Sequence, residues 1–287
     1  MSNKLEVLSE HRCFEGMQRF YKHDSSAIGL PMRFSVYIPP AAAADPNVKV
    51  PVLFYLAGLT CTEETFMIKG GAQQWAARHG IMLVTPDTSP RGANVPGEDD
   101  GWDFGTGAGF YLDATQEPWS KHYRMESYVA DELFRIATTE LPGDATRAGI
   151  FGHSMGGHGA LVLAQRHKDK YRSVSAFAPI SSPTKCPWGH KAFSGYLGDD
   201  KKQWEQYDAS LLMEKSQCPF PGGILVDQGM ADNFLAEQLY PEAFEAACKA
   251  AGQPLTLRRH EGYDHGYYFI STFMEDHMAF HAKQLKA

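Results

Sequence analysis

Short, nearly continuous apolar runs recur along this chain, each followed by a longer stretch that mixes apolar and polar residues. Continuous apolar runs are typical of parallel strands that are covered on both faces. We predict strands at Phe34–Ile38, Val52–Leu56, Ile81–Thr85, Ala148–Phe151, Val174–Ala178, Ile224–Asp227 and Leu255–Arg259.

The stretches between these runs show helical periodicity. Val129, Leu133 and Ile136, for example, recur at helical spacing and give one buried face. Strand alternating with helix predicts an α/β fold, with a mostly parallel, doubly wound central sheet, helices on both faces, and functional loops at the carboxyl ends of the strands. The helices are predicted at Ala72–His79, Met125–Thr139, His158–Lys168, Tyr240–Ala251 and Thr272–Lys286.

Two segments interrupt the alternation. Residues 86–124 are too long for an ordinary connection and are rich in Gly, Asp and aromatic residues, which indicates a functional loop. The Ala41–Pro46 insert is predicted to be a surface loop. With no internal repeat and no dividing linker, residues 1–287 are expected to form a single domain.

Composition narrows the function classes. The chain has 43% hydrophobic and 21% charged residues, and its net charge of −7 without Lys/Arg runs argues against nucleic acid as a partner. The start, Met1–Glu6, has no apolar leader, and no later run is long enough for a membrane span, so we expect no membrane partner. The cysteines are five in number and widely spaced, as in a cytoplasmic protein with reduced thiols: Cys13, Cys61, Cys186, Cys218 and Cys248.

The segment Gly152-His153-Ser154-Met155-Gly156 lies between a predicted strand and a predicted helix, where Gly-x-Ser-x-Gly forms a nucleophile elbow. The turn is so tight that a side chain at either glycine would collide with neighbouring backbone. Ser154 is therefore the candidate nucleophile. The Met155 N–H, at the positive end of the helix, is a candidate oxyanion donor.

A serine hydroxyl needs a histidine to take its proton and a carboxylate to orient that histidine. In the α/β-hydrolase order, both follow the serine on loops after late strands. Asp232 has the reach to be the acid, and Asp227 is the alternative, expected instead to bond local backbone N–H groups. His265, within a glycine-flanked turn, is the predicted base, whereas His260 is expected to be a packed or hydrogen-bonded histidine.

The second oxyanion donor should come from the loop after an early central strand, and we predict the Leu59 N–H. Cys61, three residues past Gly58, is interpreted as lining the mouth of the site, with a buried small residue as the alternative reading. His153 and His158 are expected to lie behind the site or on the surface rather than to act as bases.

Some motifs are set aside. Gly105-x-Gly107-x-Gly109 lacks the strand-to-helix setting of a dinucleotide site and is predicted to be a turn. His277 and His281 lie near a helix C-terminus and are expected to be solvated. Because no metal-ligand spacing is present either, we expect no cofactor and no metal.

Five segments together resemble the S-formylglutathione hydrolase, or esterase D, family, which has the α/β-hydrolase fold. The likeness runs from the N-terminal strands to the last helix, and the segment beginning at Gly101 is more specific than the elbow, because general esterases do not share it. The segments are Leu56–Thr62, Gly101–Tyr111, Gly152–Gly159, Asp227–Leu235 and Glu261–Tyr268.

The resemblance implies a cytoplasmic thioesterase that splits S-formylglutathione into formate and glutathione in formaldehyde detoxification. It also implies side activity on short esters, and a homodimer as the expected assembly. The family's nucleophile, acid and base fall on Ser154, Asp232 and His265, and its oxyanion donors on Leu59 and Met155. Two positions depart from the family pattern: Ala57 and Gly266 stand where serine is common.

A formyl group has almost no bulk, so the acyl pocket is expected to be small. The aromatic density of the long loop suggests that Trp102, Phe104, Phe110 and Tyr111 narrow it; the alternative, equally weighted, is that they pin the loop to the body. A general short-chain carboxylesterase or an acyltransferase with the same triad is the alternative function. A non-catalytic binding scaffold is disfavoured, since it has no need of all three triad residues.

Overall fold

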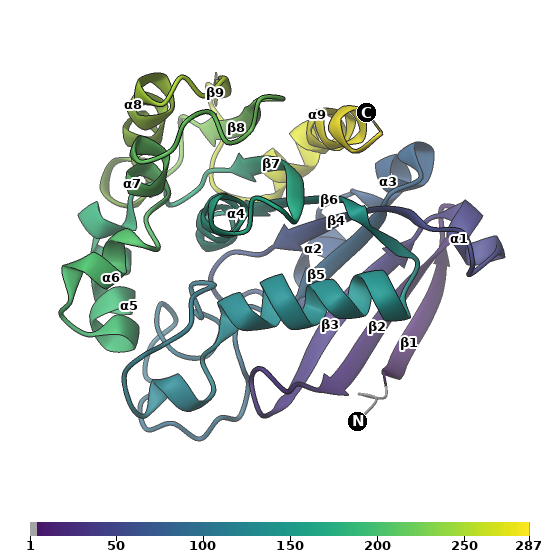
Figure 1. The fold of residues 1–287 in the computed structure, drawn as a ribbon, viewed down its shortest axis with the longest axis horizontal. Helices are drawn as coiled ribbons and strands as arrows, with labels where there is room; N and C mark the ends of the chain where they lie inside the picture. The colour runs from purple at the N-terminus through teal and green to yellow at the C-terminus, as the bar shows by residue number, and fades with distance from the viewer. Residues whose placement is uncertain (1–4, 287) are drawn as a thin grey trace.

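In the computed structural model, which describes residues 5–286, nine strands form one sheet in the order β1-β2-β3-β5-β4-β6-β7-β8-β9 (Figure 1). From β5 to β9 all neighbours pair in parallel, whereas β1, β2, β3 and β5 pair antiparallel. The strands are β1 (Glu6–Cys13), β2 (Gly16–Asp24), β3 (Pro31–Ile38), β4 (Val50–Leu56), β5 (Met82–Pro86), β6 (Gly143–His153), β7 (Tyr171–Phe177), β8 (Ile224–Gly229) and β9 (Leu255–His260). The mostly parallel sheet is as predicted, and residues 1–4, part of the segment in which no apolar leader is expected, lie outside the described residues.

The hairpin β1–β2 at the edge of the sheet was not predicted from the sequence. Every residue of β1 is exposed or half-buried, so the strand carries no buried apolar run to reveal it. Its partner β2 does alternate between buried and less buried positions, and that period of two is the signal that could have found it.

The predicted helices are present with shifted ends, and several short helices are additional. The helices are α1 (Pro40–Ala44), α2 (Glu63–Lys69), α3 (Gln73–His79), α4 (Met155–Arg166), α5 (Pro187–Leu197), α6 (Lys201–Glu205), α7 (Ala209–Glu214), α8 (Pro241–Ala250) and α9 (Tyr267–Leu285), with π-helical turns η2 (Ser127–Leu133), η3 (Ile136–Glu140) and η5 (Leu235–Leu239) and 3₁₀ turns η1 (Trp119–Lys121) and η4 (Pro183–Lys185). The surface-loop prediction for Ala41–Pro46 was wrong, because alanine is the best helix former and Pro40 suits the first helical position.

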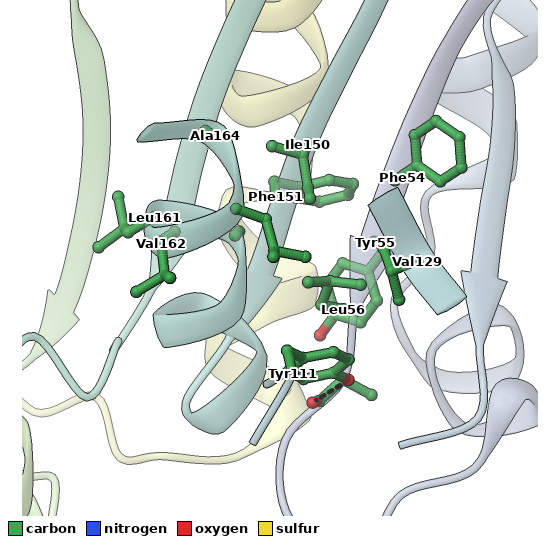
Figure 2. Packing of buried hydrophobic residues seen from close by; sticks show 14 of the residues in the cluster. Phe54, Tyr55, Leu56, Tyr111, Val129, Ile150, Phe151, Leu161, Val162 and Ala164 are labelled. Carbon is green, nitrogen blue, oxygen red and sulfur yellow. Dashed lines mark hydrogen bonds between the residues drawn. The ribbon is translucent and has the colours of Figure 1, made fainter. Parts of the chain in front are cut away.

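Helices cover both faces of the sheet, as Figure 1 shows: α3 packs against α9 on one side, and α4 lies on the other. Helix α4 packs on β6, and Leu161, Val162 and Ile150, drawn in the buried cluster of Figure 2, are at most 1% exposed. Burying each such side chain contributes roughly 1.5–3 kcal/mol. The strand and the helix that flank Ser154 are thus held together by the core itself.

The long loop after β5 contains no strand or helix from residue 87 to residue 118, apart from isolated bridges at Gly101–Phe104, Gly105–Ala108 and Asp113–Arg124. Gly105 and Gly107 have φ of +80° and +78°, so the glycine motif forms turns, as predicted. The loop crosses the edge of the sheet where the parallel strands end, and the Thr60 N–H donates to the Gly107 carbonyl at 2.9 Å.

The expectation that His277 and His281 are solvated was wrong, since both are 0% exposed. They lie on the face of α9 that packs on the sheet. His277 Nδ1 and His281 Nε2 lie 2.8 Å from the Ser175 hydroxyl of β7. Tertiary packing outweighs the interaction of a histidine with the helix dipole, and packing therefore decides where His277 and His281 lie. In residues 5–286 no helix is long and apolar enough to cross a membrane.

Candidate active site

Ser154 occupies the single residue between the end of β6 and the start of α4, with φ of +57° and ψ of −120°. Its N–H donates to the Phe177 carbonyl at 3.0 Å, which ties the turn to β7. A Cβ atom on Gly152 would lie 2.2 Å from the Gly156 carbonyl oxygen, and one on Gly156 would lie 1.9 Å from that of Leu56. The steric requirement for both glycines is thus confirmed, and the strained φ is typical of a functional position.

Asp232 and His265 are in contact: Asp232 Oδ2 lies 2.5 Å from His265 Nδ1. The carboxylate is held from two further directions, by the Phe234 N–H at 2.8 Å and by the Gln228 amide at 3.3 Å. Because an ionised carboxylate can only accept, Nδ1 carries the proton and Nε2 is free to accept one. This is the arrangement that a general base requires.

Asp227, the alternative acid, is engaged elsewhere. Its two oxygens accept from the Arg258 guanidinium at 2.6 Å each, and one of them lies 3.2 Å from His277 Nε2. Burial acts to raise the pKa of Asp227, but hydrogen bonds from His277 and Arg258 outweigh burial and hold it well below its usual range. Its partners are therefore side chains rather than the local backbone expected from the sequence.

His260 is a packed histidine, as predicted. Its ring stacks on Phe273 at 3.8 Å between centroids, and its Nε2 lies 3.3 Å from Asp227. It belongs to the same buried polar cluster as Asp227 and does not line the cavity beside Ser154.

A cavity of about 120 Å³ brings the candidate residues together. Ser154 and His265 both line it, as do Leu59 and Cys61 from the loop after β4 and Trp102 from the long loop. Met155 is the first residue of α4, so its N–H has no partner within the helix. The remaining lining residues are Gly58, His153, Trp188, Phe234 and Tyr267.

Three aromatic residues proposed to narrow the pocket do not line this cavity. Phe104 stacks on Tyr196 at 4.5 Å, Phe110 is 0% exposed, and the buried Tyr111 hydroxyl donates to the Ala57 carbonyl at 2.9 Å. Figure 2 shows Tyr111 beneath Leu56 within the core. These contacts favour the alternative reading, in which the aromatics pin the long loop, and leave Trp102 and Cys61 at the cavity.

Trp188, Phe234 and Tyr267 line the cavity but were not identified from the sequence. Trp188 comes from a segment that contains no catalytic motif, whereas Phe234 follows the candidate acid Asp232 by two residues, and the two ring centroids lie 4.8 Å apart. Tyr267 follows His265 by two residues, and that proximity is the signal that could have identified it.

The Cys61 thiol is partly buried, and burial raises its pKa above the ordinary value. The Tyr267 hydroxyl and the Lys69 ammonium act in the opposite direction but do not overcome burial. The group therefore stays a thiol at neutral pH, which suits a wall of the site better than a second nucleophile.

His153 is 6% exposed, and its ring centroid lies 4.4 Å from that of His265. Burial, assisted by the neighbouring His265, lowers the pKa of His153 well below the usual range, so the ring is neutral. His158 is 0% exposed, and its Nε2 lies 3.2 Å from the Phe110 carbonyl. Neither is placed as the base, in line with the expectation from the sequence.

A larger cavity of about 450 Å³ lies at the same edge of the sheet, lined by Lys22, Arg33, Glu63 and Arg91 among others. Arg91 is bound there by Asp87 at 2.8 Å through two nitrogens. None of the triad candidates lines this cavity.

Comparison with known proteins places this geometry in a family. The family model described as "Putative esterase" matches residues 25–280. The S-formylglutathione hydrolase of Rattus norvegicus is 51% identical over 285 residues, which cover 99% of this chain and all of the relative. That of Arabidopsis thaliana is 53% identical over 287 residues, covering all of both chains. A solved structure of an S-formylglutathione hydrolase from Agrobacterium tumefaciens is 48% identical, with a TM-score of 0.93 over 98% of this chain and 99% of that one.

Proposed function

Because the chain belongs to the S-formylglutathione hydrolase family of esterases, we propose that it hydrolyses S-formylglutathione to formate and glutathione. The observation that carries the proposal is the meeting of Ser154 and His265 at one cavity, with Asp232 bound to the far nitrogen of His265. The reaction is acyl transfer in two halves, with a formyl-enzyme between them.

In the first half, His265 Nε2 takes the Ser154 proton as Oγ bonds to the formyl carbon. The oxygen of that carbonyl becomes an oxyanion, which the N–H groups of Leu59 and Met155 stabilise. When the tetrahedral intermediate collapses, the carbon–sulfur bond breaks. Glutathione leaves with the proton from His265, and the formyl group stays on Ser154.

In the second half, a water oxygen attacks the formyl carbon while His265 takes one water proton. The new tetrahedral intermediate collapses with loss of the carbon–Oγ bond. Ser154 recovers its proton from His265, and formate is released. Both halves therefore use the same base and the same oxyanion donors. Ser154 gives its proton to His265 in the first half and takes one back in the second.

The size of the cavity supports a small acyl group. Its volume of about 120 Å³ is bounded by large rings, among them Trp102, Trp188 and Phe234. Pockets for drug-sized ligands measure roughly 300–1,000 Å³, so this one suits a group of very few atoms. Trp102 and Cys61 are proposed as substrate-contacting residues at the cavity's mouth.

We also propose the compartment and the oligomeric state of the enzyme from its resemblance to the family. The five free cysteines suit a reducing compartment, and we place the enzyme in the cytoplasm. A homodimer is the proposed assembly, which light scattering during gel filtration tests directly. Neither proposal enters the catalytic argument.

The test is turnover of S-formylglutathione beside p-nitrophenyl acetate. The thioester should have a much larger kcat/KM than the ester, and Ser154→Ala should abolish both activities. Good ester turnover with little thioester cleavage would instead assign a general short-chain carboxylesterase with the same triad.

A further inference from the structure

The segment that carries Leu59 is a tight turn beside the nucleophile. The Gly58 carbonyl accepts from the Cys61 N–H at 3.3 Å, which closes the turn over residues 58–61. A Cβ atom on Gly58 would lie 3.2 Å from Ser154 Cβ, so the turn lies directly against Ser154. Leu59 lines the cavity, and no hydrogen bond among the described residues 5–286 uses its N–H. That N–H is therefore available to an oxyanion, provided that the turn is held in place.

The residues of the turn do not favour its conformation by themselves. Thr60, the third residue, has φ of +68°, in the left-handed region that favours glycine. Because threonine is β-branched, this conformation is strained, and it persists only where the surrounding structure imposes it. The Thr60 side chain is exposed, so packing of that side chain does not supply the restraint.

Two buried hydroxyl groups of the long loop after β5 bind carbonyls on either side of Leu59. The Tyr111 hydroxyl donates to the Ala57 carbonyl at 2.9 Å, and the Thr88 hydroxyl donates to the Cys61 carbonyl at 2.6 Å. Tyr111, Thr88 and Ala57 are all 0% exposed, so water does not replace a lost hydroxyl there without cost. The chain is thus fixed both before and after the donor.

The long loop also binds the turn at its strained residue. The Thr60 N–H donates to the Gly107 carbonyl at 2.9 Å. A Cβ atom on Gly107, where φ is +78°, would lie 3.1 Å from Thr60 Cα, so the two backbones are in close contact. The Arg91 guanidinium adds a second bond to the Cys61 carbonyl at 3.2 Å. The restraint that the turn needs therefore comes from the long loop.

We propose that the long loop positions the Leu59 N–H for the oxyanion. Thr88, Gly107 and Tyr111 act through the main chain of residues 57–61 and hold this N–H in line with the reacting carbonyl. An oxyanion donor must lie within about 2.7–3.1 Å of the developing charge, so a small displacement of the turn weakens catalysis. The three are positioning residues, since they act through the main chain. The inference rests on the oxyanion role that the proposed function gives to Leu59.

Two variants remove one hydroxyl each and nearly preserve the volume of the side chain: Tyr111→Phe and Thr88→Val. The matched control is Tyr37→Phe. Tyr37 is also 0% exposed, and its hydroxyl also donates to a main-chain carbonyl, that of Phe14 at 3.1 Å, but it does not line the cavity. The melting temperature of each full-length variant is recorded, so that a loss of stability is separated from a loss of catalysis.

Two measurements report on the oxyanion. The first is hydrolysis of p-nitrophenyl acetate, which gives kcat and KM. The second uses 1,1,1-trifluoroacetone labelled with ¹³C at its carbonyl carbon. Ser154 Oγ bonds to that carbon, the Ser154 proton passes to His265, and the carbonyl oxygen becomes an oxyanion in the place that faces Leu59. The ¹³C chemical shift of this hemiketal, followed against pH, gives the pKa of its oxygen.

The expected result is weaker stabilisation of the oxyanion in both Tyr111→Phe and Thr88→Val. Their kcat and kcat/KM for p-nitrophenyl acetate should fall equally, by about tenfold, because both half-reactions use the same donors. KM should change by less than about twofold. The pKa of the hemiketal oxygen should rise by about one unit, which is the same tenfold factor. Tyr37→Phe should match the wild type in both measurements, whatever its melting temperature.

Three results would overturn the inference. The first is a loss of activity with an unchanged hemiketal pKa, since the long loop would then act on something other than the oxyanion. The second is wild-type behaviour of both Tyr111→Phe and Thr88→Val, and the third is an equal loss in Tyr37→Phe. Failure of the wild type to cleave S-formylglutathione would contradict only the proposed substrate, and the ester and ketone measurements decide the positioning role in that case too.

Discussion

Gly156 lies so close to Leu56 that a Cβ atom on it would stand 1.9 Å from the Leu56 carbonyl oxygen. The sheet holds the Leu56 carbonyl and α4 holds the Gly156 backbone, so neither can move to relieve the clash. Gly156→Ala should therefore lose soluble, active enzyme, measured as esterase activity per folded protein. Gly266→Ala is the matched control: Gly266 has φ of −88°, and its Cβ would meet a flexible carboxylate at 3.2 Å. It should keep its activity, and an active Gly156→Ala enzyme would contradict the steric account.

Asp232→Asn should lower kcat by roughly 10³–10⁴-fold while leaving the fold intact. The amide cannot accept from His265 Nδ1–H as the carboxylate does, so the imidazole adopts the wrong tautomer. Asp227→Asn is the contrasting variant, because Asp227 binds Arg258 at 2.6 Å and does not line the cavity. It should mainly lower the melting temperature. The two aspartates would have exchanged roles if Asp227→Asn lost catalysis and Asp232→Asn did not.

Glu126 should contribute to stability in a pH-dependent way. Burial opposes its ionisation, but hydrogen bonds from His167, Arg166 and Tyr207 outweigh burial and lower its pKa to about 2. Because the pKa of Glu126 is lower in the folded state than in the unfolded state, its carboxylate stabilises the fold. This stabilisation is fully present above the unfolded-state pKa, about 4.3, and is lost as the pH falls through the folded-state pKa. The shift corresponds to about 3 kcal/mol at neutral pH.

The measurement is the free energy of unfolding by guanidinium chloride from pH 7 to pH 3, for wild type and Glu126→Gln. Their difference should be about 3 kcal/mol at pH 7 and should narrow steadily below pH ~4.3. Glu205→Gln is the exposed control, since its 2.7 Å pair with Lys215 is more than two-fifths exposed on both sides. Glu205→Gln should lower the free energy of unfolding by less than about 1 kcal/mol. A Glu126→Gln difference that stays constant with pH would refute the linkage.

Trp102→Ala should widen acyl-chain preference. Trp102 is 54% exposed and lines the mouth of the cavity, so its removal opens space without unpacking the core. The ratio of kcat/KM for p-nitrophenyl butyrate to kcat/KM for p-nitrophenyl acetate should rise several-fold. Each additional methylene that the opened pocket accommodates should contribute about 1 kcal/mol of transition-state binding at most.

Phe104→Ala, from the same loop, is the comparison for that experiment. Phe104 packs on Trp119 at 4.7 Å and on Tyr196 at 4.5 Å. Its removal should lower the free energy of unfolding by about 3 kcal/mol and leave the butyrate-to-acetate ratio unchanged. A preference shift in Phe104→Ala and none in Trp102→Ala would reverse the assignment of the two rings.

The sequence allowed the sheet from β3 to β9 and the elbow to be predicted, because both depend on local patterns. Apolar runs marked the parallel strands, and two glycines marked the turn at Ser154. The edge strand β1 carries no buried residue, so its place is decided by pairing with β2 rather than by its own pattern. The alanine insert before Asp45 forms α1 instead of a surface loop because the helix propensity of four alanines, after a proline at the first helical position, decides its local structure.

The site was predictable as far as chemistry requires particular residue types in chain order. Ser154, Asp232 and His265 were chosen in that way. Trp188, a wall of the cavity, lies at the start of α5, a segment whose only relation to Ser154 is tertiary. His277 could not be placed for the same reason, since the carboxylate that it meets, Asp227, lies 50 positions away in the chain.

The central claim is that Ser154 carries the formyl group during thioester hydrolysis. The most direct measurement is to quench the enzyme during turnover of S-formylglutathione at low temperature and to map its peptides by mass spectrometry. We predict a formyl ester on the peptide that contains Ser154, and no adduct and no formate release in Ser154→Ala. Formate release by Ser154→Ala, or a formyl group found only on Cys61, would contradict the account.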